Sequence, residues 1–325
     1  MKSKTKFLLD NSTIEKLFQA AGINGITKIA PLGAGEFNAV YEVMADKAYV
    51  LKVAPGSNVP VMTYEKEMMR TEVYWYDVIR RNTDIKVPDV YYTDFSKKLI
   101  PSDWFIMEKL EGKQRNEIEI DKVLSEKKAA QMVAQIHSIK NEKFGYIQNG
   151  LYDNWYEALT SMIKNLLLDA KKMNKKSKKG EKLLNYAKKY KSILKSVPCS
   201  MVNYDLWDPN VICRKDRNGE IEMQWIDPER SFWGDRIFDF ICLGNIMAEI
   251  KDKPDSLGYY NEISAEPIEL NKETEIRFAF SMGLMALIQD VEKYYRYSPL
   301  NFGWQRNIFS SAYYYKKAFR VLNNG

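Results

Sequence analysis

The pattern of apolar and polar positions divides the chain into a first third that predicts a sheet and a remainder that predicts helices. Residues 11–22 predict a short helix, with Ser12 or Thr13 as its N-cap. Residues 26–54 hold three apolar runs separated by turn residues, which predicts an antiparallel meander. The other elements predicted in this part are a helix over 62–81 and strands over 88–94 and 103–110.

The rest of the chain is predicted to be helical with one exception. Between the helices, residues 211–227 have two short apolar runs around Asn218-Gly219, a dipeptide typical of hairpin turns. The predicted fold class is therefore α+β, with a nucleotide lobe of residues 1–110 and a helical lobe of residues 111–325. The predicted helices span 120–139, 151–170, 181–195, 236–250, 274–297 and 305–322.

Composition narrows the class of protein. A chain of 325 residues that is 45% hydrophobic is long enough for two lobes with their own cores. Its apolar runs fall short of the ~18 residues that a membrane span needs, so we expect no membrane association. Three widely spaced cysteines indicate reduced thiols and a cytoplasmic protein. A single histidine makes a Ser-His-Asp triad or a histidine-rich metal site difficult to build.

The basic charge is confined to one segment. Residues 164–195 carry twelve lysines against Asp169 and Glu181, a balance of +10, so the net charge of +6 leaves −4 for everything else. A lysine run can mark a nucleic-acid site. This run lacks arginines and has few aromatic residues for base stacking, and leucines recur on its other face. We therefore favour a solvated helix face and expect no nucleic-acid partner.

Acidic and amide side chains gather at the predicted hairpin. Asp205 precedes it, Asn210 follows five residues later, and Asp227 stands at its end. Phosphoryl transfer needs such a set, because its charged transition state depends on positioning and electrostatics. One carboxylate must accept a hydroxyl proton, and hard oxygen ligands must hold Mg²⁺. Each aspartate alone would be weak evidence, since loop-capping aspartates are common.

This arrangement resembles the aminoglycoside phosphotransferase family, relatives of the protein kinases that mostly phosphorylate small molecules. The resemblance implies a two-lobed, protein-kinase-like fold. It makes Asp205 the catalytic base, and Asn210 and Asp227 the metal ligands. Downstream, Gly234-Asp235 and then Asp239 also resemble the family. Asp239 and His137 would be structural, with Asp239 bracing the catalytic loop through backbone N–H groups.

The loop departs from the family pattern where Asn203-Tyr204 replaces His-Gly. This departure motivates a rival from another class, a catalytically degenerate protein that binds a nucleotide without turnover. A nucleic-acid binder is a third hypothesis, and it depends on the lysine segment alone.

A glycine turn between two predicted strands carries Gly33, Gly35 and Asn38. Glycines let a backbone approach phosphates closely, although an ordinary hairpin turn has the same pattern. One strand later, Lys52 lies in an apolar run, where a lysine is costly without a partner. The resemblance implies that Lys52 binds the α- and β-phosphates of the nucleotide and forms an ion pair with a glutamate of the next helix. The alternative is a lysine on the outer face of its strand.

The glutamate that pairs with Lys52 is expected on the helix over 62–81. Glu72 is preferred, because its distance to the strand after Pro88 best resembles the family, and Glu65 is the second choice. By resemblance, the strand over 103–110 is the hinge that holds adenine. The residues expected there are Met107 at the back of the pocket, the Glu108 carbonyl and the Leu110 N–H.

The resemblance implies ATP or GTP with Mg²⁺ as cofactors and a small molecule with a hydroxyl group as acceptor. Aminoglycosides, macrolides, choline-like alcohols and sugar derivatives all belong to that class. Asp227 is followed within a few residues by Gly234-Asp235, which leaves no room for the long activation segment of protein kinases. The sequence therefore predicts a small-molecule kinase.

Overall fold

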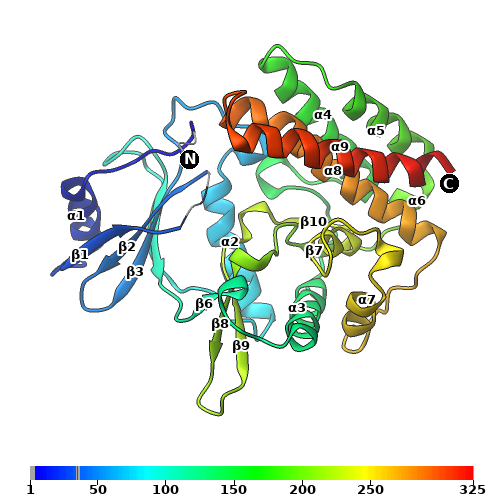
Figure 1. Cartoon of the computed structure of the whole chain (residues 1–325). Coiled ribbons are helices and arrows are strands. Elements are labelled where there is room, and N and C mark those ends of the chain that lie inside the picture. The colour runs from blue at the N-terminus through cyan, green and yellow to red at the C-terminus, as the bar shows by residue number, and fades with distance from the viewer. Residues whose placement is uncertain (1–3, 34, 36, 325) are drawn as a thin grey trace.

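The computed structural model describes residues 4–33, 35 and 37–324. A sheet-rich N-terminal region lies beside a mainly helical C-terminal part (Figure 1). The sheet has five antiparallel strands in the order β1-β2-β3-β5-β4, which confirms the predicted meander of three strands and the two further strands. The strands are β1 (Lys28–Pro31), β2 (Ala39–Met44), β3 (Ala48–Val53), β4 (Val90–Asp94) and β5 (Trp104–Glu108).

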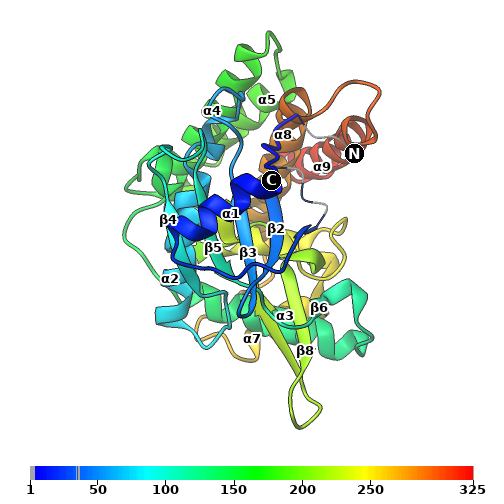
Figure 2. The ribbon, with the colours of Figure 1, turned by 90° about the vertical axis from the view of Figure 1, so that its left-hand side faces the viewer.

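The two faces of the sheet are covered by different helices. α1 (Asn11–Ala20) lies across one face and buries Leu17 and Phe18 with Leu51 of β3 (Figure 2). The predicted cap at Ser12 or Thr13 is wrong. Asp10 is the N-cap, because its carboxylate accepts the Thr13 N–H at 2.7 Å.

The helix predicted over 62–81 is interrupted near its start. A 3₁₀ turn, η1 (Thr63–Glu65), comes first, and α2 (Met68–Asn82) begins after Glu67 in a left-handed conformation. The turn η1 is bound to α4 (Trp155–Lys172) rather than to α2, because the buried Asp169 carboxylate of α4 accepts both the N–H and the hydroxyl of Thr63. α2 covers the second face of the sheet, where its residues share a core with Val50 and Phe105.

The helices predicted over 120–139, 151–170, 274–297 and 305–322 are confirmed, with ends that shift by up to four residues. The segment predicted as one helix over 181–195 breaks at Tyr190 into α5 and α6. The helices of this part are α3 (Lys122–His137), α4 (Trp155–Lys172), α5 (Lys178–Lys189), α6 (Lys191–Lys195), α7 (Pro254–Asn261), α8 (Lys272–Arg296) and α9 (Phe302–Asn324).

The helix predicted over 236–250 is wrong. A 3₁₀ helix, η6 (Arg236–Ile241), ends after six residues, and Gly244 turns the chain with φ of +60°. All six residues of η6 are buried, and the left-handed backbone at Gly244 prevents the helix from continuing. The next elements are η7 (Ile250–Asp252) and then α7, which the sequence did not predict.

The predicted hairpin is confirmed as β8 (Val211–Lys215) and β9 (Ile221–Trp225). Its turn differs, because the strands are joined through residues 216–220 with Gly219 at φ +83° rather than by a two-residue Asn-Gly turn. A third strand, β6 (Lys113–Gln114), pairs with β8. The strands β7 (Ser200–Val202) and β10 (Phe232–Gly234) pair in a small separate sheet. The remaining 3₁₀ turns are η2 (Arg115–Glu117), η3 (Ile147–Asn149), η4 (Asp208–Asn210) and η5 (Pro228–Arg230).

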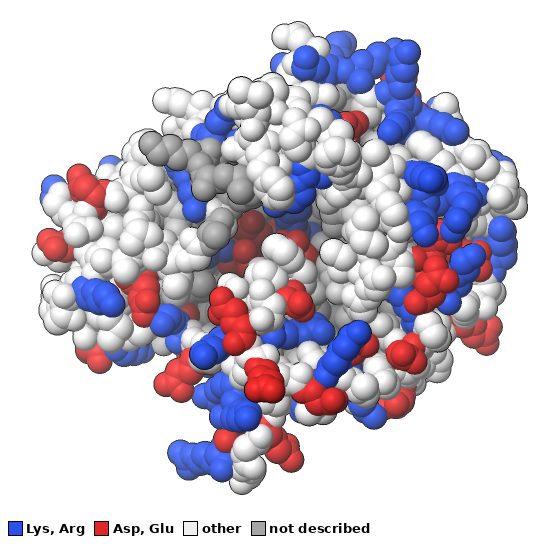
Figure 3. Space-filling view, viewed as in Figure 1, with Lys and Arg blue, Asp and Glu red and all other residues white. Residues whose placement is uncertain are grey.

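The lysine segment runs over α4, α5 and α6 and has the expected amphipathic character. All twelve lysines between 164 and 195 are exposed, whereas Leu166, Leu183 and Leu194 are buried. Basic side chains accordingly gather along one edge of the molecule (Figure 3). Among the described residues, no helix combines the length and the apolar character that crossing a membrane would take.

Gly283 permits the close approach of α8 and α5. A Cβ at this position would lie 2.5 Å from Leu183 Cδ1. We predict that Gly283→Ala lowers the free energy of unfolding by about 1–3 kcal/mol through overpacking, although alanine favours helix. Gly258 in α7 has open space around it, so Gly258→Ala is the matched control and should raise stability by about 0.5–1 kcal/mol. Urea titration of both variants measures the difference, and equal effects would contradict this packing.

Candidate functional site

Asp205 lies in the loop between β7 and β8, and side chains of the same loop hold its backbone in place. Asn203 Oδ1 accepts the Asp205 N–H at 2.7 Å. Asn210 Nδ2 donates to the Asp205 carbonyl at 2.9 Å and lies 3.4 Å from Asp205 Oδ2. Tyr204 has a left-handed backbone and a fully buried ring, whose hydroxyl donates to the Ser281 carbonyl. Asn203 and Tyr204, which depart from the family pattern, are thus both built into the loop.

Asp239 lies beneath this loop and is fully buried. Its carboxylate accepts the backbone N–H groups of Asn203 (2.9 Å) and Tyr204 (2.5 Å). His137 Nε2 lies 3.0 Å from the same carboxylate, and His137 Nδ1 contacts the Tyr260 hydroxyl. Burial lowers the pKa of His137, although its bond to Asp239 opposes this effect. His137 and Asp239 therefore fix the loop from a buried position.

A chain of buried charges leads away from Asp205. Burial raises the pKa of Asp205 to about 6, and the Arg230 guanidinium, with Nε 3.6 Å from Asp205 Oδ2, opposes this rise. Arg230 also contacts Glu292 (3.2 Å), which pairs with Arg296 (2.9 Å). Arg296 in turn pairs with Glu65 at 2.5 Å. Glu65, the second choice as partner of Lys52, therefore has a different partner.

Lys52 is buried and faces α2 rather than solvent, on the same side of β3 as Val50. Its Nζ donates to Glu72 Oε1 (2.8 Å), Glu72 Oε2 (2.7 Å) and Asp227 Oδ1 (2.7 Å), and lies 3.7 Å from Glu229. Burial alone would lower the pKa of Lys52, but the three carboxylates raise it well above its usual value. The alternative of a lysine on the outer strand face is excluded.

Three carboxylates with oxygens within 4.8 Å of one another, those of Glu72, Asp227 and Glu229, surround the Lys52 ammonium. One positive charge does not balance three negative ones, and burial raises the pKa of both Glu72 and Glu229. Asn210 is tied to this cluster through its carbonyl, which accepts the Ile226 N–H at 3.0 Å. Hard oxygen donors with excess negative charge fit Mg²⁺. Acidic side chains also line a hollow in the middle of one molecular face (Figure 3).

The glycine turn connects to the same cluster. Asn38 is buried, and its Nδ2 donates to Glu229 Oε2 at 2.7 Å. Gly33 has φ of +72°, and a Cβ at either Gly33 or Gly35 would meet open space. The open surroundings leave room for a ligand next to this backbone. Ala34 and Glu36 of the turn lie outside the described residues.

The three residues expected at the hinge lie at the end of β5. Met107 is buried opposite Val50 of β3. Glu108 pairs through its carboxylate with Lys86, and Leu110 follows as a buried residue two positions later. Gly112 then passes so close to β8 that a Cβ would lie 2.4 Å from the Cys213 carbonyl oxygen. The chain thus leaves the sheet at the place where an inter-lobe hinge is expected.

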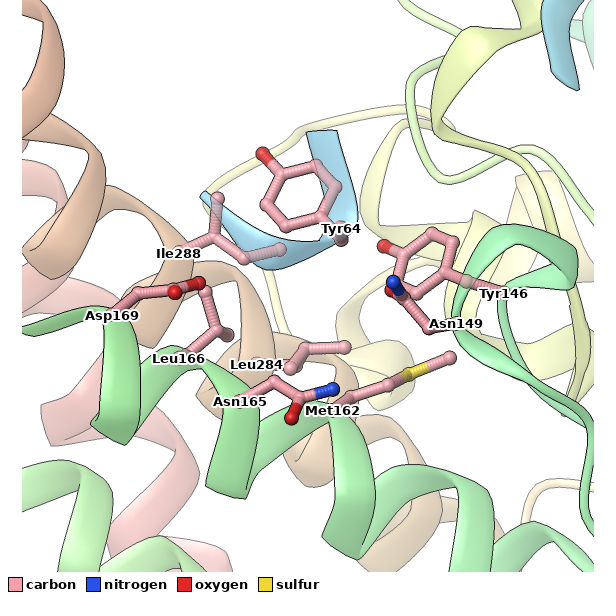
Figure 4. Close-up of a pocket in the computed structure, with 9 residues that line it drawn as sticks. All are labelled: Tyr64, Tyr146, Asn149, Met162, Asn165, Leu166, Asp169, Leu284 and Ile288. Atoms are coloured by element: carbon pink, nitrogen blue, oxygen red, sulfur yellow. The ribbon is translucent and has the colours of Figure 1, made fainter. Parts of the chain in front are cut away.

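Sequence reasoning missed three residues of the site, Tyr76, Glu229 and Arg230. Tyr76 stands four residues after Glu72, so both lie on one face of α2. Glu229 and Arg230 follow Asp227 directly, and this proximity was the available signal. A separate cavity of about 10 Å³, the room of one water, lies between α4, α8 and the two 3₁₀ turns η1 and η3 (Figure 4). Its lining includes none of the residues around Lys52.

Comparisons with known proteins identify related chains. Residues 28–262 match the model of the phosphotransferase enzyme family. No curated protein matches the sequence. Among solved structures, a candidate fructosamine-3-kinase from Thermobifida fusca YX-ER1 is 17% identical with a TM-score of 0.63, covering 96% of this chain and 100% of that chain. The microcompartment-associated aminopropanol kinase is 16% identical with a TM-score of 0.60, covering 97% and 98%.

A third structure is the ternary complex of streptomycin, ATP and APH(2'')-IIa, which is 16% identical with a TM-score of 0.58 and coverage of 94% and 97%. At these identities the likeness concerns the fold. This likeness confirms the protein-kinase-like architecture that the family resemblance implied.

The contacts of Asp239 with the loop and with His137 predict that its removal lowers the stability of the fold. Asp239→Ala leaves two backbone N–H groups and His137 buried without their acceptor, so the free energy of unfolding should fall by about 3–5 kcal/mol. Asp153→Ala, which removes an exposed carboxylate, is the control and should barely change the urea midpoint. If Asp239→Ala is as stable as the control, Asp239 is not a brace.

Proposed function

Since the chain belongs to the phosphotransferase enzyme family, we propose that it transfers the γ-phosphoryl group of a nucleoside triphosphate to a hydroxyl group of a small molecule. The observation that carries this proposal is the convergence of Asp205, Asn210 and Asp227 beside the buried Lys52–Glu72 pair. The residues come from the sheet, α2 and the catalytic hairpin, so only the folded chain assembles them.

Asp205 is the proposed catalytic base. Its pKa of about 6 leaves it deprotonated at neutral pH, yet basic enough to accept a proton from a hydroxyl as the phosphoryl group is transferred. Asn210 and Asn203 fix the backbone around it, so its carboxylate needs little reorganisation. An exposed carboxylate of ordinary pKa would be a weaker base.

Lys52 is proposed to bind the triphosphate, with Glu72 holding its ammonium in place. Asp227 and Asn210 are the proposed ligands of Mg²⁺, which when bound neutralises charge that develops on the phosphates. Gly33, Gly35 and Asn38 would place the glycine turn over the phosphates. The Asn38 contact with Glu229 supports this arrangement, because it joins that turn to the carboxylate cluster.

The donor is proposed to be ATP or GTP, bound between the lobe of residues 1–110 and the lobe of residues 111–325. Met107, Glu108 and Leu110 would contact the base at the hinge. The complex of ATP with APH(2'')-IIa supports ATP in particular.

The proposed location is the cytoplasm. Three free thiols suit a cytoplasmic protein.

The acceptor is proposed to be a small molecule, with aminoglycosides as one candidate class. Asp227 is followed within five residues by β10, which pairs at once with β7, so this segment is short and fixed. A long segment of the kind that docks peptides in protein kinases has no place there. The named neighbours, which include an aminopropanol kinase, support small alcohols and amino sugars as first tests.

The direct test is transfer from γ-labelled ATP and GTP, with and without Mg²⁺, to a panel of aminoglycosides, macrolides, small amino alcohols and sugar amines. We predict Mg²⁺-dependent labelling of one class, and a loss of about 10²–10⁴-fold in kcat for Asp205→Asn. Asp208→Asn, which changes an exposed carboxylate of the same loop, is the control. Nucleotide binding without transfer to any acceptor would favour the degenerate, non-catalytic protein instead.

The raised pKa of Asp205 predicts a pH profile. The base works when deprotonated, so kcat/KM should be constant above pH 7 and fall as the pH drops through about 6. Arg230→Gln removes the cation that favours the carboxylate, so the midpoint should move to higher pH. A midpoint that stays fixed or moves to lower pH in Arg230→Gln would contradict this electrostatic assignment.

A further inference from the structure

Tyr76 connects Glu72 with Asp227, which lies 151 residues after Tyr76 in the sequence. It lies in α2, one helical turn after Glu72, and is fully buried. Its hydroxyl donates to Glu72 Oε1 at 2.9 Å and accepts the Asp227 N–H at 3.0 Å. A phenol hydroxyl has one proton and accepting lone pairs, so both bonds are satisfied by the same atom.

The second of these bonds acts on an unusual backbone. Asp227 is in the left-handed conformation, with φ of 65° and ψ of 51°, which is uncommon for a residue other than glycine. Pro228 follows and has no N–H. The Tyr76 hydroxyl therefore holds the Asp227 N–H, the backbone donor at this turn. This bond fixes the direction in which Asp227 presents its carboxylate to Lys52.

We propose that Tyr76 is a positioning residue that sets the Asp227 carboxylate at the angle needed to hold Mg²⁺ with the nucleotide. This inference rests on the proposed function. Tyr76 touches neither the nucleotide nor the metal in this scheme. Its bond to Glu72 anchors the hydroxyl on α2, whereas Lys52 keeps its own two bonds to Glu72, so the effect of Tyr76 on the site passes through Asp227.

Tyr76→Phe tests the inference, because it removes the hydroxyl and keeps the buried ring. Tyr190→Phe is the matched control. Tyr190 is also buried, and its hydroxyl donates to the carbonyl of Leu322 in α9 at 2.9 Å, with no bond to any described residue of the site. Thermal unfolding of both variants shows whether each remains folded.

The first measurement is amide hydrogen exchange in the protein without metal or nucleotide. The exchange of the Asp227 N–H is followed at single-residue resolution by NMR, so that it is distinguished from that of Ile226. We expect its exchange to accelerate about tenfold or more in Tyr76→Phe, the loss of one buried hydrogen bond, and to be unchanged in Tyr190→Phe. Unchanged protection in Tyr76→Phe overturns the inference.

The second measurement is the affinity for ATP by calorimetry, with Mg²⁺ and with EDTA. We expect Tyr76→Phe to weaken Mg²⁺-ATP binding about tenfold and to leave metal-free ATP binding within twofold of wild type. Equal weakening in both conditions, or none, overturns the positioning role. If the wild-type protein itself binds ATP without any effect of Mg²⁺, the proposed function fails, whereas the exchange experiment still tests the bond.

Discussion

The Lys52 ammonium, enclosed by the carboxylates of Glu72, Asp227 and Glu229, is the interaction on which the rest of the structure depends. A buried lysine without partners would lose its charge, and three buried carboxylates without a cation would repel one another. Each side therefore requires the other. Because Lys52 lies on β3, Glu72 on α2 and the two remaining carboxylates after β9, this single charge fixes the sheet, the helix and the hairpin relative to one another.

Two further networks extend this arrangement to the loop that carries Asp205. Asp239 holds the loop from below through backbone N–H groups, and Arg230 reaches the Asp205 carboxylate from the side. The charges continue from Arg230 through Glu292 and Arg296 to Glu65 in the N-terminal region. The buried chain of alternating charges thus joins the region before α2 to α8. Positioning by such buried, paired groups is what a phosphotransferase needs, since its reaction depends mainly on fixed electrostatics.

The sequence predicted the features that depend on short-range pattern and on the order of motifs. The five strands follow from apolar runs and the turn residues between them, and the place of Asp205, Asn210 and Asp227 from their spacing around the hairpin. Predictions failed where tertiary contacts decide local structure. The segment 236–250 is not one α-helix, because the chain turns at Gly244 in a left-handed conformation. The 3₁₀ turn η1 is separate from α2, because the Asp169 carboxylate accepts both the N–H and the hydroxyl of Thr63. Tyr76 and Glu65 have roles set by partners that are distant in the sequence.

The most direct test of the central claim is calorimetric titration of ATP into the wild-type protein, Lys52→Ala and Asp227→Ala, each with Mg²⁺ and with EDTA. If the carboxylate cluster around Lys52 is the nucleotide and metal site, one ATP binds per chain, and Lys52→Ala weakens binding in both conditions. Asp227→Ala should remove only the increment due to Mg²⁺. Wild-type affinity for Mg²⁺-ATP in both variants would contradict the account, because the cluster would then be a structural ion pair alone.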